Sequence, residues 1–242
     1  IAADHFISLS NFLEIIKYNN PEFFKYPLKK NINIEYLINQ ICLKVFPNKL
    51  ELFPKVFNGE KGIISDFGIA PLRSAYAIYQ SIISTNLSNN ICEIGAGVGR
   101  SAYYSFLLGA KKYTIVDLPI SSMVQSYFLL KTLGKSKVNF LEDIKLNNFD
   151  GILLLSPDEF FSTSINYDLV INVDSLTELG EETANKYLDY IEINAKKFLS
   201  MNHENNNFSV SELIKKRKRF KRVYRIKSWL RNGYIEELYE VD

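Results

Sequence analysis

The spacing of apolar residues changes near residue 89 of this chain. Before it, apolar residues recur every three or four positions, which predicts amphipathic helices. We expect such helices in residues 4–20, 33–46 and 71–85. Residues 57–70 contain three glycines and are predicted to form a loop with turns.

After residue 89, short apolar runs alternate with helical periods. We predict strands at 91–94, 113–116, 138–141, 167–173 and 197–201. Helices are expected between them, at 100–109, 120–133 and 181–196. This alternation predicts a parallel sheet with both faces covered. Residues 149–164 are interpreted as an extra strand and helix, and the hairpin signal Asn232-Gly233 predicts two antiparallel strands at the end of the sheet.

The change of period divides the chain into an N-terminal helical cap, residues 1–88, and an α/β domain, residues 89–242. A length of 242 residues suits one large domain or a domain with a lid. The net charge of +2 gives no global field that would indicate nucleic acid or an anionic membrane. The basic run 215–222 is interpreted as a solvated face near a strand start, with an anionic contact as the alternative.

The two cysteines, Cys42 and Cys92, lack the spacing of metal ligands and fit a reducing, cytoplasmic location. No apolar run of about 18 residues indicates a membrane span, and the first residues do not read as a signal segment. Because the sequence starts at Ile1 and not at Met, the chain can be a piece of a longer protein.

Three of the 11 glycines are Gly95, Gly97 and Gly99, directly after the strand predicted at 91–94. A glycine-rich turn between a first strand and a first helix is typical of a nucleotide-cofactor site, because glycine lets the backbone pass close to the ligand. Asp117 lies 20 residues beyond Gly97, at the end of the next strand, where an acid can accept both ribose hydroxyls. A plain tight turn, and a helix N-cap for Asp117, are the alternatives.

The spacing of these glycines distinguishes two cofactor classes. Dinucleotide sites use G-x-G-x-x-G, in which a helix N-terminus faces a pyrophosphate. Here Arg100 occupies the position of the third glycine, and the pattern is G-x-G-x-G. Glu93 would repel a pyrophosphate but suits a cofactor that carries an ammonium and a sulfonium. An NAD-dependent dehydrogenase is therefore the disfavoured alternative.

The stretch from Glu93 to Gly99 resembles motif I of the class I S-adenosylmethionine-dependent methyltransferases, and residues 90–242 fit the layout of that family. Four segments together resemble its sugar O-methyltransferase group: IGAGVGRSAYY, YTIVDLP, INVDSLTELG and FLSMNHENN. The resemblance implies an α/β, Rossmann-like class I methyltransferase sheet that is mostly parallel, with the last strand antiparallel and an N-terminal helical cap.

The resemblance also implies which residues hold S-adenosyl-L-methionine. Asp117 would hold the ribose, with Leu118 beside it, and Asp143 or Glu142 would take the adenine amino group. The region of Asn172 would cover the sulfonium. Arg73 is a candidate for the methionine carboxylate, with a surface salt bridge as its alternative. The methionine end would lie against the turn and the acid before it, which are Glu93, Gly95, Ala96, Gly97 and Gly99.

Methyl transfer is an in-line displacement in which the protein mainly aligns the acceptor. A sugar hydroxyl also benefits from a general base, and His203, after the last parallel strand, can accept a proton at neutral pH. Asp174 is the rival base, or else a cap for the following helix. Glu178 is a weaker catalytic candidate, because the helix dipole alone favours an acid in a first turn. Without an adjacent Asp-Asp pair or a histidine cluster, we expect no metal.

These patterns predict an S-adenosylmethionine-dependent O-methyltransferase that acts on a hydroxyl of a sugar or glycan precursor and not on nucleic acid. One alternative is methylation of another small-molecule O or N acceptor. Another is a cofactor-binding homologue without activity. The presence of Asp174, Glu178 and His203 favours an active enzyme over an inert homologue. An inert homologue has no need of three such side chains at the catalytic edge.

Overall fold

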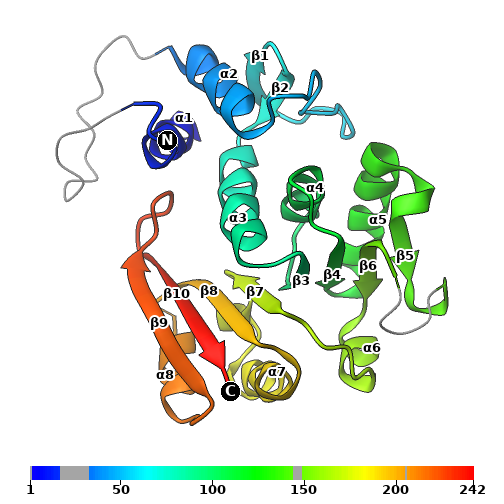
Figure 1. Ribbon diagram of the computed structural model, residues 1–242, viewed down its shortest axis with the longest axis vertical. Helices are drawn as coiled ribbons and strands as arrows, with labels where there is room; N and C mark the ends of the chain where they lie inside the picture. Colours follow the sequence, from blue (N-terminus) through cyan, green and yellow to red (C-terminus); the bar gives the residue numbers. More distant parts are fainter. Residues whose placement is uncertain (1, 17–32, 144–148, 205) are drawn as a thin grey trace. The chain divides into compact units, whose positions relative to one another are not determined.

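The computed structural model describes residues 2–16, 33–143, 149–204 and 206–242 (Figure 1). The chain divides into two compact units, Ile1–Tyr79 and Gln80–Asp242. The division falls within helix α3 (Ser74–Leu87), whereas the sequence analysis placed it at the end of this segment, between residues 88 and 89.

The first unit contains helices and one hairpin: α1 (Ala2–Phe12), α2 (Ile34–Val45), β1 (Gly62–Ser65), β2 (Gly68–Pro71) and the first part of α3. Helix α1 ends earlier than the helix predicted in residues 4–20. Residues 17–20 of that predicted helix lie outside the described part. The loop predicted at 57–70 is wrong in part, because β1 and β2 pair antiparallel around a two-residue turn. Two of the glycines that indicated a loop, Gly62 and Gly68, are the first residues of these strands.

The second unit contains an eight-stranded sheet in the order β5-β6-β4-β3-β7-β8-β10-β9. All pairs from β5 to β8 are parallel, and β10 is antiparallel to both β8 and β9, which confirms the predicted fold class. The strands are β3 (Asn90–Ile94), β4 (Lys112–Val116), β5 (Val138–Phe140), β6 (Gly151–Leu155), β7 (Leu169–Val173), β8 (Lys197–His203), β9 (Phe220–Lys227) and β10 (Tyr234–Val241).

The helices that connect these strands are α4 (Arg100–Leu107), α5 (Pro119–Leu133), α6 (Pro157–Ser162), α7 (Glu181–Asn194) and α8 (Val210–Lys215). Single 3₁₀ turns are η1 (Lys135–Lys137), η2 (Leu141–Asp143) and η3 (Leu176–Glu178). The extra strand and helix expected at 149–164 are β6 and α6. All five residues of β6 are buried, as its continuous apolar run indicates for an interior parallel strand.

The order of the strands locates the ligand edge of the sheet. From β3 the chain passes outward through β4 on one side and later returns to β7 on the other. In open α/β sheets, the crevice beyond the carboxyl ends of the strands at such a reversal is where ligands bind. The segments that follow β3, β4, β7 and β8 therefore meet at one edge, and these are the segments that contain most of the candidate site residues.

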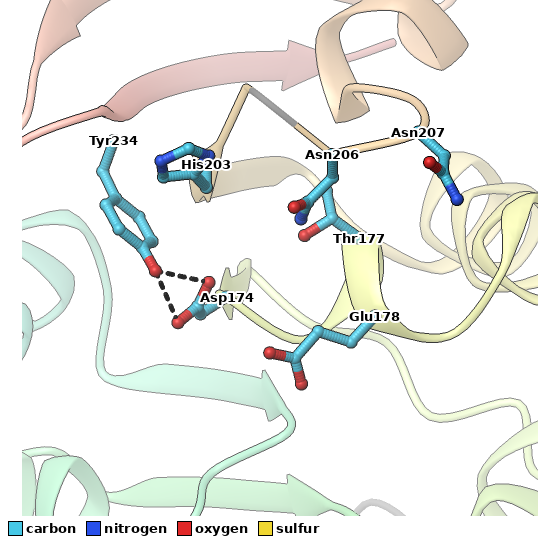
Figure 2. Close-up of a pocket in the computed structure, with 7 residues that line it drawn as sticks. All are labelled: Asp174, Thr177, Glu178, His203, Asn206, Asn207 and Tyr234. Atoms are coloured by element: carbon cyan, nitrogen blue, oxygen red, sulfur yellow. Dashed lines mark hydrogen bonds between the residues drawn. The ribbon is translucent and has the colours of Figure 1, made fainter.

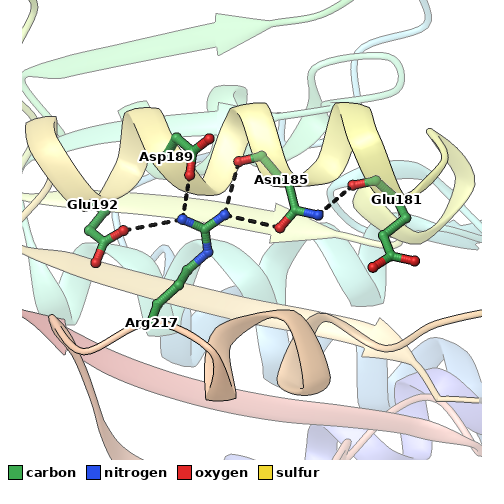
Figure 3. A network of polar contacts seen from close by, with 5 residues as sticks. All are labelled: Glu181, Asn185, Asp189, Glu192 and Arg217. Carbon is green, nitrogen blue, oxygen red and sulfur yellow. Dashed lines mark hydrogen bonds and ion pairs between the residues drawn. The ribbon is translucent and has the colours of Figure 1, made fainter.

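The basic run 215–222 extends from the end of α8 into the start of β9, and one of its members is not solvated. The side chain of Arg217 is only 12% exposed and forms ion pairs with two acids of α7, Asp189 at 2.5 Å and Glu192 at 3.1 Å. Its second terminal nitrogen donates to the carbonyl and amide oxygens of Asn185 at 3.2 and 3.0 Å (Figure 3). For Arg217 the prediction of a solvated face was wrong, because α7 presents hydrogen-bond acceptors at successive turns.

Replacing Arg217 should destabilise the fold more than replacing its neighbour. Arg217→Met leaves the half-buried Glu192 unpaired, and hydrogen bonds to charged groups contribute roughly 1.5–3 kcal/mol each, so we expect a loss of about 2 kcal/mol. Lys216→Met is the matched control, because Lys216 and Glu181 form an exposed pair at 3.8 Å that should contribute less than about 1 kcal/mol. Urea unfolding of both variants measures this, and equal losses would contradict it.

Candidate functional site

The turn after β3 has an unusual backbone. Gly95, Gly97 and Gly99 all have positive φ, at +77°, +58° and +87°. A Cβ at Gly95 would lie 2.3 Å from the Oγ of Ser175, so only glycine fits there. A Cβ at Gly97 would have no heavy atom within 4 Å. The turn is thus closed against the protein at Gly95 and open at Gly97, where a ligand can approach the backbone.

Asp117 lies half-buried directly after β4, with each carboxylate oxygen held by one donor. Oδ1 accepts from the backbone N–H of Leu118 at 2.8 Å, and Oδ2 accepts from Nε2 of Gln125 at 2.7 Å. The same amide nitrogen of Gln125 donates to the carbonyl oxygen of Gly97 at 3.1 Å. The N-cap of α5 is Leu118, not Asp117, so the alternative role as a helix cap is wrong. Gln125 was missed because nothing in the sequence shows which side of α5 faces the turn.

Glu93 lies inside β3 and is only 2% exposed. Burial raises the pKa of its carboxyl to about 7, against the opposing effect of a hydrogen bond that the hydroxyl of Tyr113 donates to Oε2 at 2.8 Å. A buried carboxyl of this kind is most stable in its charged form when a cation lies beside it. Its position directly before the glycine turn is suitable for an ammonium.

Asn172 links three strands and does not itself reach the surface. Its Nδ2 donates to the carbonyl oxygen of Ile94 at 2.9 Å, and its Oδ1 accepts from Asn202 at 2.9 Å. The hydroxyl of Ser175 donates to the same carbonyl at 2.9 Å. This network connects β3, β7 and β8 just below the ligand edge. A direct contact of Asn172 with a cofactor stays a prediction.

A polar pocket of about 470 Å³ lies at the ends of β7 and β8 (Figure 2). The structure brings together in it all three residues that the sequence proposed for catalysis. Four further lining residues were missed. One of them, Tyr234, directly follows the hairpin signal Asn232-Gly233, and the antiparallel register pairs it with His203. The lining residues are Asp174, Thr177, Glu178, His203, Asn206, Asn207 and Tyr234.

The carboxylate of Asp174 is held by the β9–β10 hairpin. The hydroxyl of Tyr234 lies 2.8 Å from each carboxylate oxygen, and a terminal nitrogen of Arg231 lies 2.7 Å from Oδ2. The guanidinium of Arg231 lies over the Tyr234 ring, 3.6 Å from its centroid. Burial and the bond to Asp174 raise the pKa of Tyr234 to about 12, so its hydroxyl remains a donor. The backbone of Asp174 has φ +66°, a conformation that costs free energy in a residue other than glycine.

His203 and Glu178 differ from Asp174 in their surroundings. The His203 ring packs edge-on against Tyr234, with centroids 5.1 Å apart. It also lies against the backbone of Gly233, where a Cβ would be 2.7 Å from Nε2. Glu178 is exposed and forms no side-chain hydrogen bond or ion pair with the described residues. Of the two pocket carboxylates, only that of Asp174 is neutralised by a cation.

Three further candidate cofactor residues belong to other segments of the chain. Arg73 belongs to the first unit, directly before α3. Glu142 is exposed in η2, after β5. Asp143 ends the same turn, and its side chain lies outside the described part. The roles assigned to all three stay predictions.

The described ranges hold no group of three or more metal-ligating side chains placed to bind one ion. None of their helices is long and apolar enough to cross a membrane.

No protein-family model and no curated protein sequence matches the chain. Solved structures do. The PH0226 protein from Pyrococcus horikoshii OT3 is 14% identical, with a TM-score of 0.54 over 78% of this chain and 97% of that one. A TehB-like S-adenosylmethionine-dependent methyltransferase from Corynebacterium glutamicum is 12% identical, with a TM-score of 0.51 over 69% and 88%. The magnesium protoporphyrin IX methyltransferase from Synechocystis PCC 6803, with bound S-adenosylhomocysteine, is 14% identical, with a TM-score of 0.50 over 69% and 80%.

Likeness at this level of identity establishes the fold. The chain has the Rossmann-like sheet that S-adenosylmethionine-dependent class I methyltransferases use.

The titration of Glu93 should be visible in the stability of the ligand-free protein. Its pKa rises from 4.5 to about 7 on folding, so between these values the folded chain keeps a proton that the unfolded chain has lost. The free energy of unfolding therefore falls as pH rises through this window. Glu93→Gln removes the titration, so relative to the parent it should gain on the order of 2–3 kcal/mol between pH 5 and pH 8.

Urea unfolding at both pH values measures this gain. The control is Glu182→Gln on α7, which removes a carboxylate from an exposed site, where it pairs with Lys186 at 3.0 Å, and should not show this gain. A constant difference for Glu93→Gln as well would show that Glu93 does not titrate in this range.

Proposed function

We propose that this protein is an S-adenosylmethionine-dependent O-methyltransferase that acts on a hydroxyl of a sugar or glycan precursor. The observation that carries this proposal is the arrangement along one sheet edge. Glu93, the open Gly97 and Asp117 lie at the ends of β3 and β4. The pocket with Asp174 and His203 lies at the ends of the neighbouring β7 and β8.

The first half of this edge suits S-adenosylmethionine. Glu93 can bind the ammonium, and Asp117 has one internal hydrogen bond on each oxygen, which leaves lone pairs for the two ribose hydroxyls. The open backbone at Gly97 admits the ligand between them. NAD fits less well, because the buried Glu93 would face the pyrophosphate.

The chemistry of the pocket supports a polyhydroxylated acceptor. Its lining supplies carboxylates, amides, hydroxyls and an imidazole, and includes no Lys, Arg or aliphatic side chain among the described residues. Hydroxyl groups both donate and accept, so a sugar can satisfy such a lining. A phosphorylated acceptor would find no Lys or Arg among the described residues that line the pocket, and a large aromatic acceptor would find little surface on which to stack.

The surroundings of the two candidate bases favour His203. Asp174 is already engaged by Tyr234 and Arg231, so a proton transferred to it would disrupt its ion pair with Arg231 and its bond from Tyr234. When bound, S-adenosylmethionine supplies a methyl group on a sulfonium. His203 would then accept the proton of the acceptor hydroxyl, so that the hydroxyl oxygen can take the methyl group. Tyr234 packs edge-on against the His203 ring and would hold it in place, and Asp174 would hold the acceptor.

Cofactor binding gives the first test. S-adenosylhomocysteine should bind with micromolar affinity and raise the melting temperature, because it binds the folded state alone, whereas NAD should not. Gly97→Val should abolish binding by filling the open space. Gly109→Val is the matched control, because Gly109 also has positive φ, +100°, and open surroundings, but lies at the far end of α4. A shift with NAD and none with S-adenosylhomocysteine would overturn the proposed cofactor.

The proposed base gives the second test, in single-turnover transfer of labelled methyl to a panel of mono- and disaccharides. His203→Ala should lower the rate about 10²–10⁴-fold with nearly unchanged cofactor affinity. Asp174→Asn keeps an acceptor for Tyr234 and should lower the rate about tenfold or less. The reverse order would make Asp174 the base. Cofactor binding without transfer to any sugar would favour another acceptor or a homologue without activity.

A further inference from the structure

Gln125 connects two turns that are far apart in the sequence. It lies in the second turn of α5 and is fully buried. Its Nε2 donates both to the carbonyl oxygen of Gly97, at 3.1 Å, and to Oδ2 of Asp117, at 2.7 Å. One amide group thus ties the turn after β3 to the acid after β4.

The chemistry of its partners fixes the orientation of this amide. With oxygen and nitrogen exchanged, Oε1 would face a carbonyl and a carboxylate, neither of which can donate a hydrogen bond. In the orientation observed, Oε1 is buried and has no hydrogen-bond partner among the described residues. A buried acceptor without a partner costs free energy, so stability of the fold alone does not account for this amide.

We propose that Gln125 is a positioning residue for recognition of the cofactor ribose, an inference that rests on the proposed cofactor. The Leu118 N–H on one oxygen and the Gln125 amide on the other prevent the carboxylate of Asp117 from rotating. Both oxygens then keep free lone pairs in a fixed plane, as two adjacent ribose hydroxyls require. The bond to Gly97 fixes the distance between this carboxylate and the open part of the turn.

The test compares two ligands, S-adenosylhomocysteine and its 2′-deoxyribose analogue, by calorimetry. The parent should prefer the ribose form about tenfold, the value of one hydrogen bond to a charged group. Gln125→Met keeps the length of the side chain and removes both donors, so the preference should shrink to less than about threefold. Ser126→Ala on the same helix loses only a hydroxyl bond to the Ser122 carbonyl at 2.6 Å, and should keep the full preference.

A second variant, Gln125→Glu, should give a pH dependence of affinity that a packing role alone would not produce. Gln125→Glu places a carboxylate against that of Asp117, so the pair keeps one proton up to a higher pH than either group alone and repels once that proton is lost. Its affinity for S-adenosylhomocysteine, as a ratio to the parent, should be at least tenfold lower at pH 8 and recover towards pH 6, where one proton bridges the pair. The ratio for Gln125→Met should not change with pH.

The outcomes separate this proposal from the proposed function. If the parent itself does not bind S-adenosylhomocysteine, the proposed cofactor fails. If the parent binds and Gln125→Met keeps its preference for the ribose form, or weakens both ligands equally, then Gln125 only packs and the inference is wrong. Melting temperatures of the ligand-free variants identify any that fail to fold, and Gln125→Glu then decides by its pH dependence.

Discussion

The close contact between Gly95 and Ser175 is the constraint on which the ligand edge depends. Ser175 fills the space where a Cβ of residue 95 would lie, and its hydroxyl bonds to the carbonyl of Ile94. The first contact fixes where the chain leaves β3, and the second fixes where it leaves β7. Asp174, whose backbone has positive φ, directly precedes Ser175. The glycine turn after β3 and the polar pocket are therefore adjacent to a single junction.

Three carboxylates at this edge have different surroundings, and these differences separate their roles. Glu93 is buried inside β3, and burial raises the pKa of its carboxyl to about 7 against the opposing hydrogen bond from Tyr113. Asp117 has one donor on each oxygen and remains half-open. Asp174 is paired with Arg231 and Tyr234. One group therefore suits a cation, one suits hydroxyls, and one organises its neighbours.

The sequence predicted the strands of the large sheet and three of the seven pocket residues, because these depend on local signals. Apolar runs define buried strands, and a polar residue directly after a parallel strand must lie at the common edge. This is why Asp174, Glu178 and His203 could be grouped without coordinates. The hairpin β1–β2 was missed because its glycines, typical of loops, lie at the starts of the strands.

What the sequence could not predict depends on contacts between distant segments. Gln125 was missed because its function depends on the rotation of α5 about its own axis. Arg231 and Tyr234 were missed because their contacts depend on the register of β10 against β8. The solvation of Arg217 was predicted wrongly because its charge partners lie on another helix. In each case the deciding neighbour lies in a segment to which no local pattern points.

The pairing of Asp174 with the β9–β10 hairpin has a consequence for biosynthesis. The residues proposed for the cofactor in the second unit begin with β3, whereas Arg231 and Tyr234 belong to the last hairpin of the described chain. A ribosome therefore releases the groups proposed for the cofactor well before Arg231 and Tyr234. Contacts that join residues 57 and 60 positions apart, as these two make with Asp174, form late because a long loop must close. A nascent chain can thus complete the turn after β3 and the acid after β4 before the polar pocket is closed.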